Sequence, residues 1–96
     1  MRFEWDSFKN SSNLKKHGIS FEEAVLIFSD KNSLSIYDYD NTMKEDRWIT
    51  MGMIPVGKVY VVVHTDRSNK NDNIIRIISA RKATKNEIKQ YIESLR

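Results

Sequence analysis

The second half of the chain concentrates side chains that could handle a phosphodiester. A ribonuclease that uses no metal needs a base for the 2′-hydroxyl, cations for the charge on the phosphorane, and an acid for the leaving 5′-oxygen. Arginine suits the phosphate because its planar fork donates two hydrogen bonds at once. Histidine can serve as base or acid because its reference pKa is about 6.5. The candidate residues are Arg47, His64, Thr65, Arg67, Arg76, Arg81 and Lys82. They form a site only if neighbouring strands bring some of them to one end or one face of a sheet.

The same residues have a structural alternative. Arg76 lies between Ile75 and Ile77, as an outward-facing residue of a half-buried strand would. His64 directly follows three valines, so the alternative for it is a buried core histidine whose ring nitrogens have hydrogen-bond partners. The residue types alone therefore leave open whether this set binds phosphate or stabilises the fold.

Two further polar groups stand out. Lys15, Lys16 and His17 lie where a helix should end, and there they offset the helix dipole; contact with RNA phosphates is the alternative role. The acidic residues between positions 38 and 46 lack the tight loop spacing of a hard-cation site. His64-x-Asp66 is likewise too short to define a metal centre. We expect no metal and no cofactor.

Composition narrows the class of protein. The chain has 96 residues and a net charge of +3, and it has no cysteine, which excludes a disulfide scaffold, a thiolate zinc site and a cysteine nucleophile. The longest apolar runs, 24–28 and 59–63, are far below the ~18 residues of a membrane span. The first residues show no hydrophobic signal segment. We expect one globular domain over residues 1–96, in the cytoplasm and away from membranes.

Charge is divided unequally along the chain. Residues 1–57 carry seven Lys/Arg and nine Asp/Glu, whereas residues 58–96 carry nine Lys/Arg and four Asp/Glu. A basic second half and a pI near 9.2 favour a polyanion partner. A solvated basic surface is the alternative, because such patches are common on soluble proteins.

The N-terminal third predicts a short strand over 2–5 and a helix over 7–16. Asp6 should cap this helix at its start, and Gly18 should end it. The apolar stripe expected for it consists of Phe8 and Leu14.

A second helix should begin after Ser20 and end near 29–30. Ser20 and Glu23 have the spacing of a capping box. At helical periodicity its buried face consists of Phe21, Ala24, Val25 and Phe28.

From Leu34 the hydrophobic period changes to two, which is typical of strands. Segment 58–65 contains four valines and is apolar on both faces, so it should be a central strand. Thr84 and Glu87 form a capping box for a last helix. The other strands are expected at 34–39, 47–54 and 74–80, with a turn at 40–42 and a polar loop at 66–73.

Consecutive strands joined by short turns predict an antiparallel meander. The fold class is therefore α+β: an antiparallel sheet covered by two N-terminal helices and one C-terminal helix. The apolar face expected of the last helix consists of Ile88, Tyr91, Ile92 and Leu95.

Four motifs in order resemble the signature of the BrnT toxin family, over nearly the whole chain from residue 3 to residue 91. The opening motif is Phe3-Glu4-Trp5-Asp6 with Lys9, Asn13, Lys16-His17-Gly18 and Ser20-Phe21-Glu22-Glu23-Ala24. The middle motif is Arg47-Trp48 with Gly52. The last two motifs are 62–67 (VVHTDR) and 76–84 (RIISARKAT), and Glu87 and Tyr91 follow them.

This resemblance implies the toxin of a type II toxin–antitoxin system. Such a toxin is a small ribonuclease with a RelE-like fold, which cleaves RNA and so inhibits translation and growth. The basic residue set and the lack of a metal-ligand pattern predict that this cleavage needs no metal. The implied partner is a ribbon-helix-helix antitoxin that binds operator DNA in the complex.

Carried over motif by motif, the resemblance implies a catalytic set in which Arg67 and Arg81 rank above His64. The remaining members of the set are Thr65, Arg47 and Lys82. Two features depart from the family pattern, namely Asp66 in place of a more usual Glu and the Asn/Lys-rich loop 68–73. The alternative function, from another class, is a non-catalytic nucleic-acid-binding module or repressor.

Overall fold

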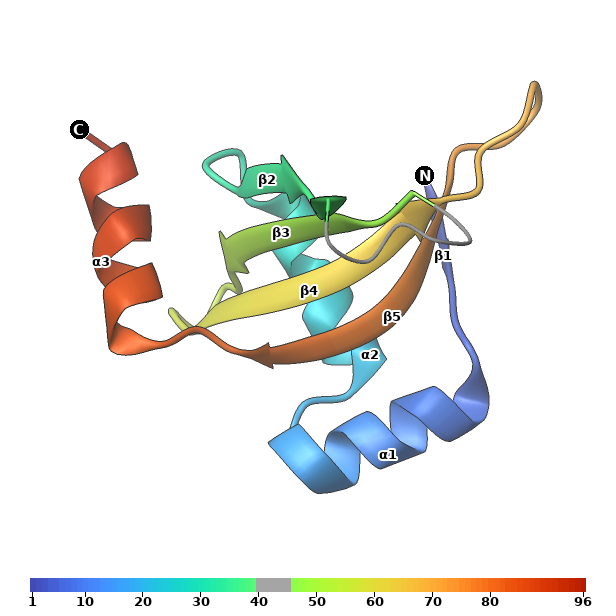
Figure 1. Ribbon diagram of the computed structural model, residues 1–96, viewed down its shortest axis with the longest axis horizontal. Coiled ribbons are helices and arrows are strands. Elements are labelled where there is room, and N and C mark those ends of the chain that lie inside the picture. Colours follow the sequence, from blue (N-terminus) through green and yellow to red (C-terminus); the bar gives the residue numbers. More distant parts are fainter. Residues whose placement is uncertain (40–45) are drawn as a thin grey trace.

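The computed structural model describes residues 1–39 and 46–96 and contains one five-stranded sheet in the order β1-β5-β4-β3-β2 (Figure 1). The predicted turn at 40–42 and the carboxylates Asp40 and Glu45 lie outside the described residues. The strands are β1 (Arg2–Glu4), β2 (Leu34–Tyr37), β3 (Trp48–Met53), β4 (Val59–Asp66) and β5 (Ile74–Lys82).

The predicted meander is confirmed for four strands and wrong for the first. Strands β2 to β5 pair as antiparallel neighbours in chain order, with β4 central as expected. Strand β1 instead runs parallel to β5, with Phe3 opposite Ile75. Helices connect β1 to β2, so no hairpin requires β1 to be antiparallel to its neighbour. Strand β1 therefore pairs in parallel with the free edge of β5. The α+β sheet is therefore mixed.

The expected helix boundaries are largely confirmed. Helix α1 (Ser7–His17) begins at Asp6, whose carboxylate accepts from two backbone amides, and ends at Gly18 with φ of 71°. Helix α3 (Lys85–Ser94) has the complete capping box of Thr84 and Glu87. Because φ is positive at Gly18, glycine is the residue that ends α1 without strain.

The second helix differs from its prediction. Only α2 (Phe21–Ala24) is α-helical, and the chain tightens into the 3₁₀ helix η1 (Val25–Ser29). The tighter turn brings Ile27, three residues after Ala24, into the core with no exposed surface. The capping box is also only half formed, because Glu23 accepts a 2.6 Å hydrogen bond from the Tyr60 hydroxyl instead.

Helix α1 is attached to the sheet by a polar contact. The predicted stripe is wrong, since the exposed fractions of Phe8 and Leu14 are 83% and 50%, and Asn13 is the buried residue. The Asn13 amide donates to Ala80 O at 2.8 Å and accepts from Ala80 N at 3.1 Å. It also donates to Ile19 O. Asn13 thus pairs with the edge of β5 beyond β1 as a neighbouring strand would.

The two faces of the sheet differ in what covers them. On the covered face, α2 and η1 pack over a core that includes Phe21, Ile27, Tyr60, Val62 and Ile77. In Figure 1 these helices lie behind the sheet. On the opposite face, which we call the open face, no helix of the described part of the chain lies over β3 and β4, and α1 lies beside β5 at the edge of the sheet.

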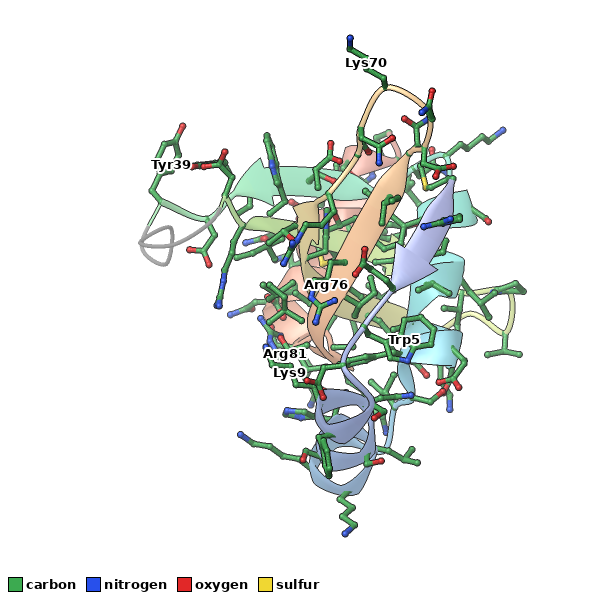
Figure 2. The ribbon with its side chains drawn as sticks, turned by 90° about the vertical axis from the view of Figure 1, so that its right-hand side faces the viewer. Trp5, Lys9, Tyr39, Lys70, Arg76 and Arg81 are labelled. Atoms are coloured by element: carbon green, nitrogen blue, oxygen red, sulfur yellow. The ribbon has the colours of Figure 1, made fainter. Side chains whose placement is uncertain are left out.

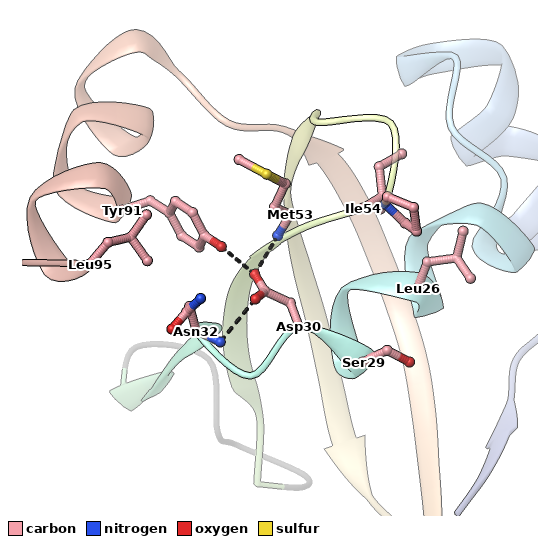
Figure 3. Close-up of a pocket in the computed structure, with 9 residues that line it drawn as sticks. Leu26, Ser29, Asp30, Asn32, Met53, Ile54, Tyr91 and Leu95 are labelled. Atoms are coloured by element: carbon pink, nitrogen blue, oxygen red, sulfur yellow. Dashed lines mark hydrogen bonds between the residues drawn. The ribbon is translucent and has the colours of Figure 1, made fainter.

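The prediction that α3 covers the sheet is wrong. Figure 1 shows α3 beyond one end of β3 and β4, and Ile92 and Leu95 each remain 48% exposed. Its anchor is Tyr91, which donates to Asp30 (Figure 3). Burial opposes ionisation of Asp30, but its hydrogen bonds from Tyr91, Met53 N and Asn32 N outweigh burial and lower its pKa.

Among the described residues, none of the helices is long and apolar enough to cross a membrane.

Candidate active site

Strand register decides which candidate residues share a face. Val61, Val63 and Thr65 alternate with Val62 and His64 along β4, so they point to the open face. On β5, Arg76 lies opposite Thr65, Ser79 opposite Val63, and Arg81 opposite Val61. The open face therefore presents two arginines with a serine between them along one strand.

One row of polar residues crosses the open face from strand to strand. Arg76 is the register partner of both Thr65 on β4 and Glu4 on β1. Arg47 directly precedes Trp48, the first residue of β3, which pairs with His64, and continuing this register by one residue sets Arg47 opposite Thr65. The Thr65 hydroxyl is buried and has no hydrogen-bond partner among the described residues. The predicted candidates Arg47, Thr65 and Arg76 are thus neighbours.

Arg76 is held by a carboxylate. Its Nη1 lies 2.7 Å from Glu4 Oε2, and the two side chains are 27% and 42% exposed. Figure 2 shows Arg76 and Arg81 on one side of the sheet and Trp5 on the other. Trp5 packs edge-on against Phe21 of the covered face. Because the pair is open to water, it contributes little stability, and Arg76 can exchange its partner for a phosphate.

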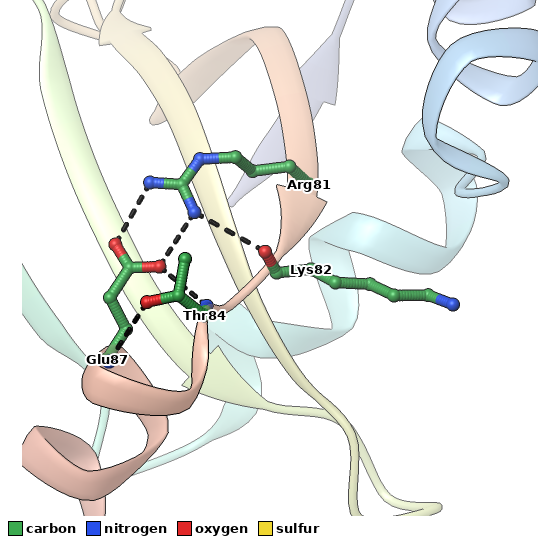
Figure 4. A network of polar contacts seen from close by, with 4 residues as sticks. All are labelled: Arg81, Lys82, Thr84 and Glu87. Atoms are coloured by element: carbon green, nitrogen blue, oxygen red, sulfur yellow. Dashed lines mark hydrogen bonds and ion pairs between the residues drawn. The ribbon is translucent and has the colours of Figure 1, made fainter.

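Arg81 is also held by a carboxylate. Its guanidinium donates to both oxygens of Glu87, at 2.7 and 2.9 Å, across the turn into α3 (Figure 4). The hydrogen bond from Arg81, together with bonds from Thr84, lowers the pKa of Glu87 to about 2. The same hydrogen bond raises the pKa of Arg81. The pair is therefore fully ionised at neutral pH, and Glu87 is a weak base.

Two predicted residues lie apart from this set. Lys82 follows Arg81 but points to the other face, opposite Tyr60, beside a hollow lined by Ile88 of α3. Arg67 begins the loop after β4, with its amide bonded to Ile74 O. Arg81 pairs with Val61 on β4, and Arg67 lies six residues further along the chain than Val61. At ~3.3 Å of strand per residue, Arg67 is therefore about 20 Å from Arg81.

His64 lies on the covered face and is 93% buried, with an exposed fraction of 7%. Its Nε2 is 2.7 Å from Thr50 Oγ1, and its ring meets Phe28 edge-on at 5.0 Å between centroids. Burial lowers the pKa of His64 to about 4, against a smaller opposite effect of Asp66. The structure thus separates His64 from the arginines of the open face by the thickness of the sheet.

The carboxylates that hold the arginines were missed by reasoning from sequence. Glu4 meets Arg76 across 72 positions of chain, and no local pattern signals that contact. Glu87 lies only six positions from Arg81, and its capping box with Thr84 fixes the turn that brings them together.

In the described part of the chain, no group of three potential ligands could hold a metal ion.

The fold and this face define a class: a small α+β protein with one sheet, whose open side presents arginines suited to a phosphodiester. The chain belongs to the BrnT ribonuclease toxin family of type II toxin–antitoxin systems, whose family model matches residues 5–87. It is thus a toxin-family protein with an antitoxin partner and an RNA substrate implied by that family.

The fold has a counterpart among solved structures. The chain is similar to the crystal structure of the Brucella abortus ribonuclease toxin, BrnT, with 22% sequence identity and a TM-score of 0.60. The similarity covers 88% of this chain and 99% of that chain. At this identity the likeness supports the fold. No curated protein sequence matches this chain.

Proposed function

We propose that this protein is a metal-independent endoribonuclease whose reaction takes place on the open face. The observation that carries the proposal is the placement of Arg76 and Arg81 on the same face of β5, each held by one carboxylate. Arg47 and Thr65 complete the row beside Arg76. Together these residues offer cationic donors over a stretch of sheet long enough for an extended RNA strand.

The chemistry is cleavage by the neighbouring hydroxyl of the RNA itself. The 2′-oxygen loses its proton and bonds to phosphorus, the bond from phosphorus to the 5′-oxygen breaks, and that oxygen takes up a proton. The products are a 2′,3′-cyclic phosphate and a 5′-hydroxyl. An arginine that donates two hydrogen bonds to the non-bridging oxygens stabilises the extra negative charge of the phosphorane.

Each arginine must leave its carboxylate to serve in this way. Arg76 and Glu4 are both partly exposed, and so are Arg81 and Glu87. Exchange of the carboxylate for a phosphate costs little at the single-contact pair of Arg76 and Glu4, because water screens the original attraction. The two-bond pair of Arg81 and Glu87 is stronger, and a phosphate replaces Glu87 by accepting both hydrogen bonds in its place. The carboxylates therefore hold the guanidinium groups in position until RNA arrives.

The remaining predicted residues take other roles in this proposal. Arg67, at the far end of β4, binds RNA beside the cleaved phosphate, and Lys82 contributes general positive charge. His64 packs the covered face and does not transfer a proton, because its ring is buried there with Phe28. The burial of His64 and the register of β4 and β5 support this assignment.

In the cell, the proposal extends to regulation. The toxin, with a fold related to RelE-type toxins, cleaves RNA in the cytoplasm and thereby blocks translation. A ribbon-helix-helix antitoxin neutralises it, and the complex reaches operator DNA through the antitoxin. An acidic antitoxin segment would be steered to the basic second half of the chain, which carries nine Lys/Arg against four Asp/Glu. An apolar segment would instead bind there by burying its surface.

One experiment with two arms tests this. Purified protein is incubated with RNA in excess EDTA, and we expect multiple-turnover fragments ending in 2′,3′-cyclic phosphate. Cleavage that stops in EDTA and returns with magnesium would disprove the metal-independent mechanism. RNA that is bound but left intact in both conditions would favour the non-catalytic binding module. In the second arm, growth arrest on expression should be relieved by co-expression of the neighbouring open reading frame.

A further inference from the structure

Phe8 of α1 is an aromatic ring that the fold leaves open to solvent. Its exposed fraction is 83%, although a helix residue of this size normally packs against a sheet. Phe8 lies at the rim of a hollow of about 340 Å³ between α1 and β5. From α1 it is also lined by Lys9, Asn13, Lys16 and His17, and from β5 by Ile78 and Ser79.

The charge of this hollow points to an anionic occupant. Two lysines and a histidine line it, and no carboxylate does. A second hollow on the same helix, lined by Leu14 and Glu22 among others, is the opposite case: its only charged side chain is a carboxylate. An exposed ring flanked by lysines combines a stacking surface with positive charge, which is how proteins hold single-stranded nucleic acid without reading its sequence.

The hollow is continuous with the open face. Ser79 belongs to both, since it lines the hollow and lies between Arg76 and Arg81 on the open face of β5. The neighbouring Ile78 has no register partner, because the pairing of β4 and β5 shifts at this point. Such a bulge re-aims side chains at a sheet edge, and here Ile78 lines the hollow. In Figure 2, Lys9 lies on the same side of the molecule as Arg76 and Arg81, away from Trp5.

We infer that this hollow binds one nucleotide of single-stranded RNA next to the segment on the open face, with its base stacked on Phe8 and its phosphates on Lys9 and Lys16. The inference rests on the proposed function, because it extends the same RNA path beyond the reacting phosphate. Stacking requires only the face of a base, so this subsite accepts any of the bases. Asn13, at the floor of the hollow, is already fully engaged with β5 and holds α1 in place.

The test uses a short, mixed-sequence 2′-O-methyl oligoribonucleotide, which binds but cannot be cleaved because its 2′-oxygen is blocked. Fluorescence anisotropy should show Phe8→Ala binding it about tenfold more weakly, the usual scale for one stacked base. Phe8→Trp should retain binding. Leu14→Ala, which removes an exposed apolar side chain from the other hollow of α1, should leave binding unchanged.

The lysines are tested by salt. Replacing Lys9 or Lys16 by Ala should reduce the slope of log affinity against log salt by about 0.7 for each phosphate that is no longer neutralised.

Each outcome separates this inference from the proposed function. Wild-type affinity in Phe8→Ala, or equal losses in Phe8→Ala and Leu14→Ala, would overturn the inference even if RNA is cleaved. Weakened binding of the antitoxin in Phe8→Ala, with RNA binding intact, would overturn it in favour of a protein surface. If RNA is never cleaved but the oligonucleotide responds to Phe8→Ala as expected, the proposed function fails and the binding site stands.

Discussion

The two faces of the sheet use polar residues in different ways. On the covered face, the buried residues Thr50 and His64 lie 2.7 Å apart, and the Thr50 hydroxyl is also 2.7 Å from that of the exposed Ser35. On the open face, Arg76 and Arg81 form ion pairs that remain partly exposed to water. Buried polar groups resist exchange of partners because losing one leaves an unsatisfied atom, whereas exposed ion pairs exchange readily. The covered face is therefore suited to stability, and the open face to binding a changing partner.

The largest effect that we expect is on the rate of RNA cleavage, and it distinguishes Arg81 from its neighbour Lys82 on the opposite face of the sheet. Arg81→Ala should lower the rate of RNA cleavage about 100-fold or more, the usual scale for losing one donor that stabilises the transition state. Lys82→Ala should change the rate much less, because Lys82 points to the face of Tyr60. Single-turnover cleavage assays, with circular dichroism to confirm the fold, make the comparison.

Two further variants serve as controls for this effect. Arg81→Lys should not fully restore the rate, because lysine lacks the planar fork. Glu87→Gln keeps Arg81 and removes its counter-charge, so it should retain activity. Equal rates for Arg81→Ala and the unmodified protein, with the fold intact, would remove the open face from catalysis.

The burial of His64 on the covered face should make the stability of the protein depend on pH. The pKa of His64 falls from 6.5 to about 4 on folding because the ring is buried, so below pH ~6.5 the unfolded chain binds a proton that the folded protein rejects. The free energy of unfolding should therefore fall by up to about 3 kcal/mol between pH ~6.5 and ~4, and His64 should contribute nothing further below that range. Urea denaturation over this range measures it.

His64→Gln is the matched variant, because glutamine keeps hydrogen-bonding atoms and cannot be protonated in this range. Its unfolding free energy should vary less with pH than that of the unmodified protein. An imidazole that titrates near pH ~6.5 in the folded state by NMR would contradict the buried environment.

The smallest expected effect concerns packing. A β-carbon at Gly52 on the covered face would lie 2.9 Å from Cβ of Ile27 and 3.1 Å from its carbonyl oxygen. Gly52→Ala should therefore cost about 1–3 kcal/mol of stability, as overpacked cores do. Ser79→Ala on the open face should change stability by less than about 0.5 kcal/mol. Thermal unfolding of the two variants compares the faces, and equal shifts in Tm would contradict the assignment.

Much of the secondary structure could be read from local signals in the sequence. Asp6 and Thr84 start their helices and Gly18 ends one, because caps are interactions among residues close in the chain. The central strand followed from the valines of 59–63, since a segment apolar on both sides must be buried on both sides. The motif order likewise indicated the family, which the match over residues 5–87 confirms.

The errors arose where the deciding contact is distant in the chain. Phe8 and Leu14 have the spacing of a buried stripe, yet Asn13 holds the helix, because the unpaired edge of β5 supplies backbone partners that only a folded sheet creates. The buried Ile27 was missed because a 3₁₀ turn changes which residue faces inward. The last helix has an apolar face but is anchored at Tyr91 by Asp30, 61 positions away.

The sequence by itself determined the elements, the family and the residue types available to bind a phosphate. The tertiary structure alone decided that Arg76 and Arg81 share a face with Thr65 and that His64 lies on the other. The physical reason is that successive residues of a strand point to opposite faces, and a bulge changes this alternation on one strand only. Which side chains meet therefore depends on the register between strands, which the pairing of the whole sheet sets.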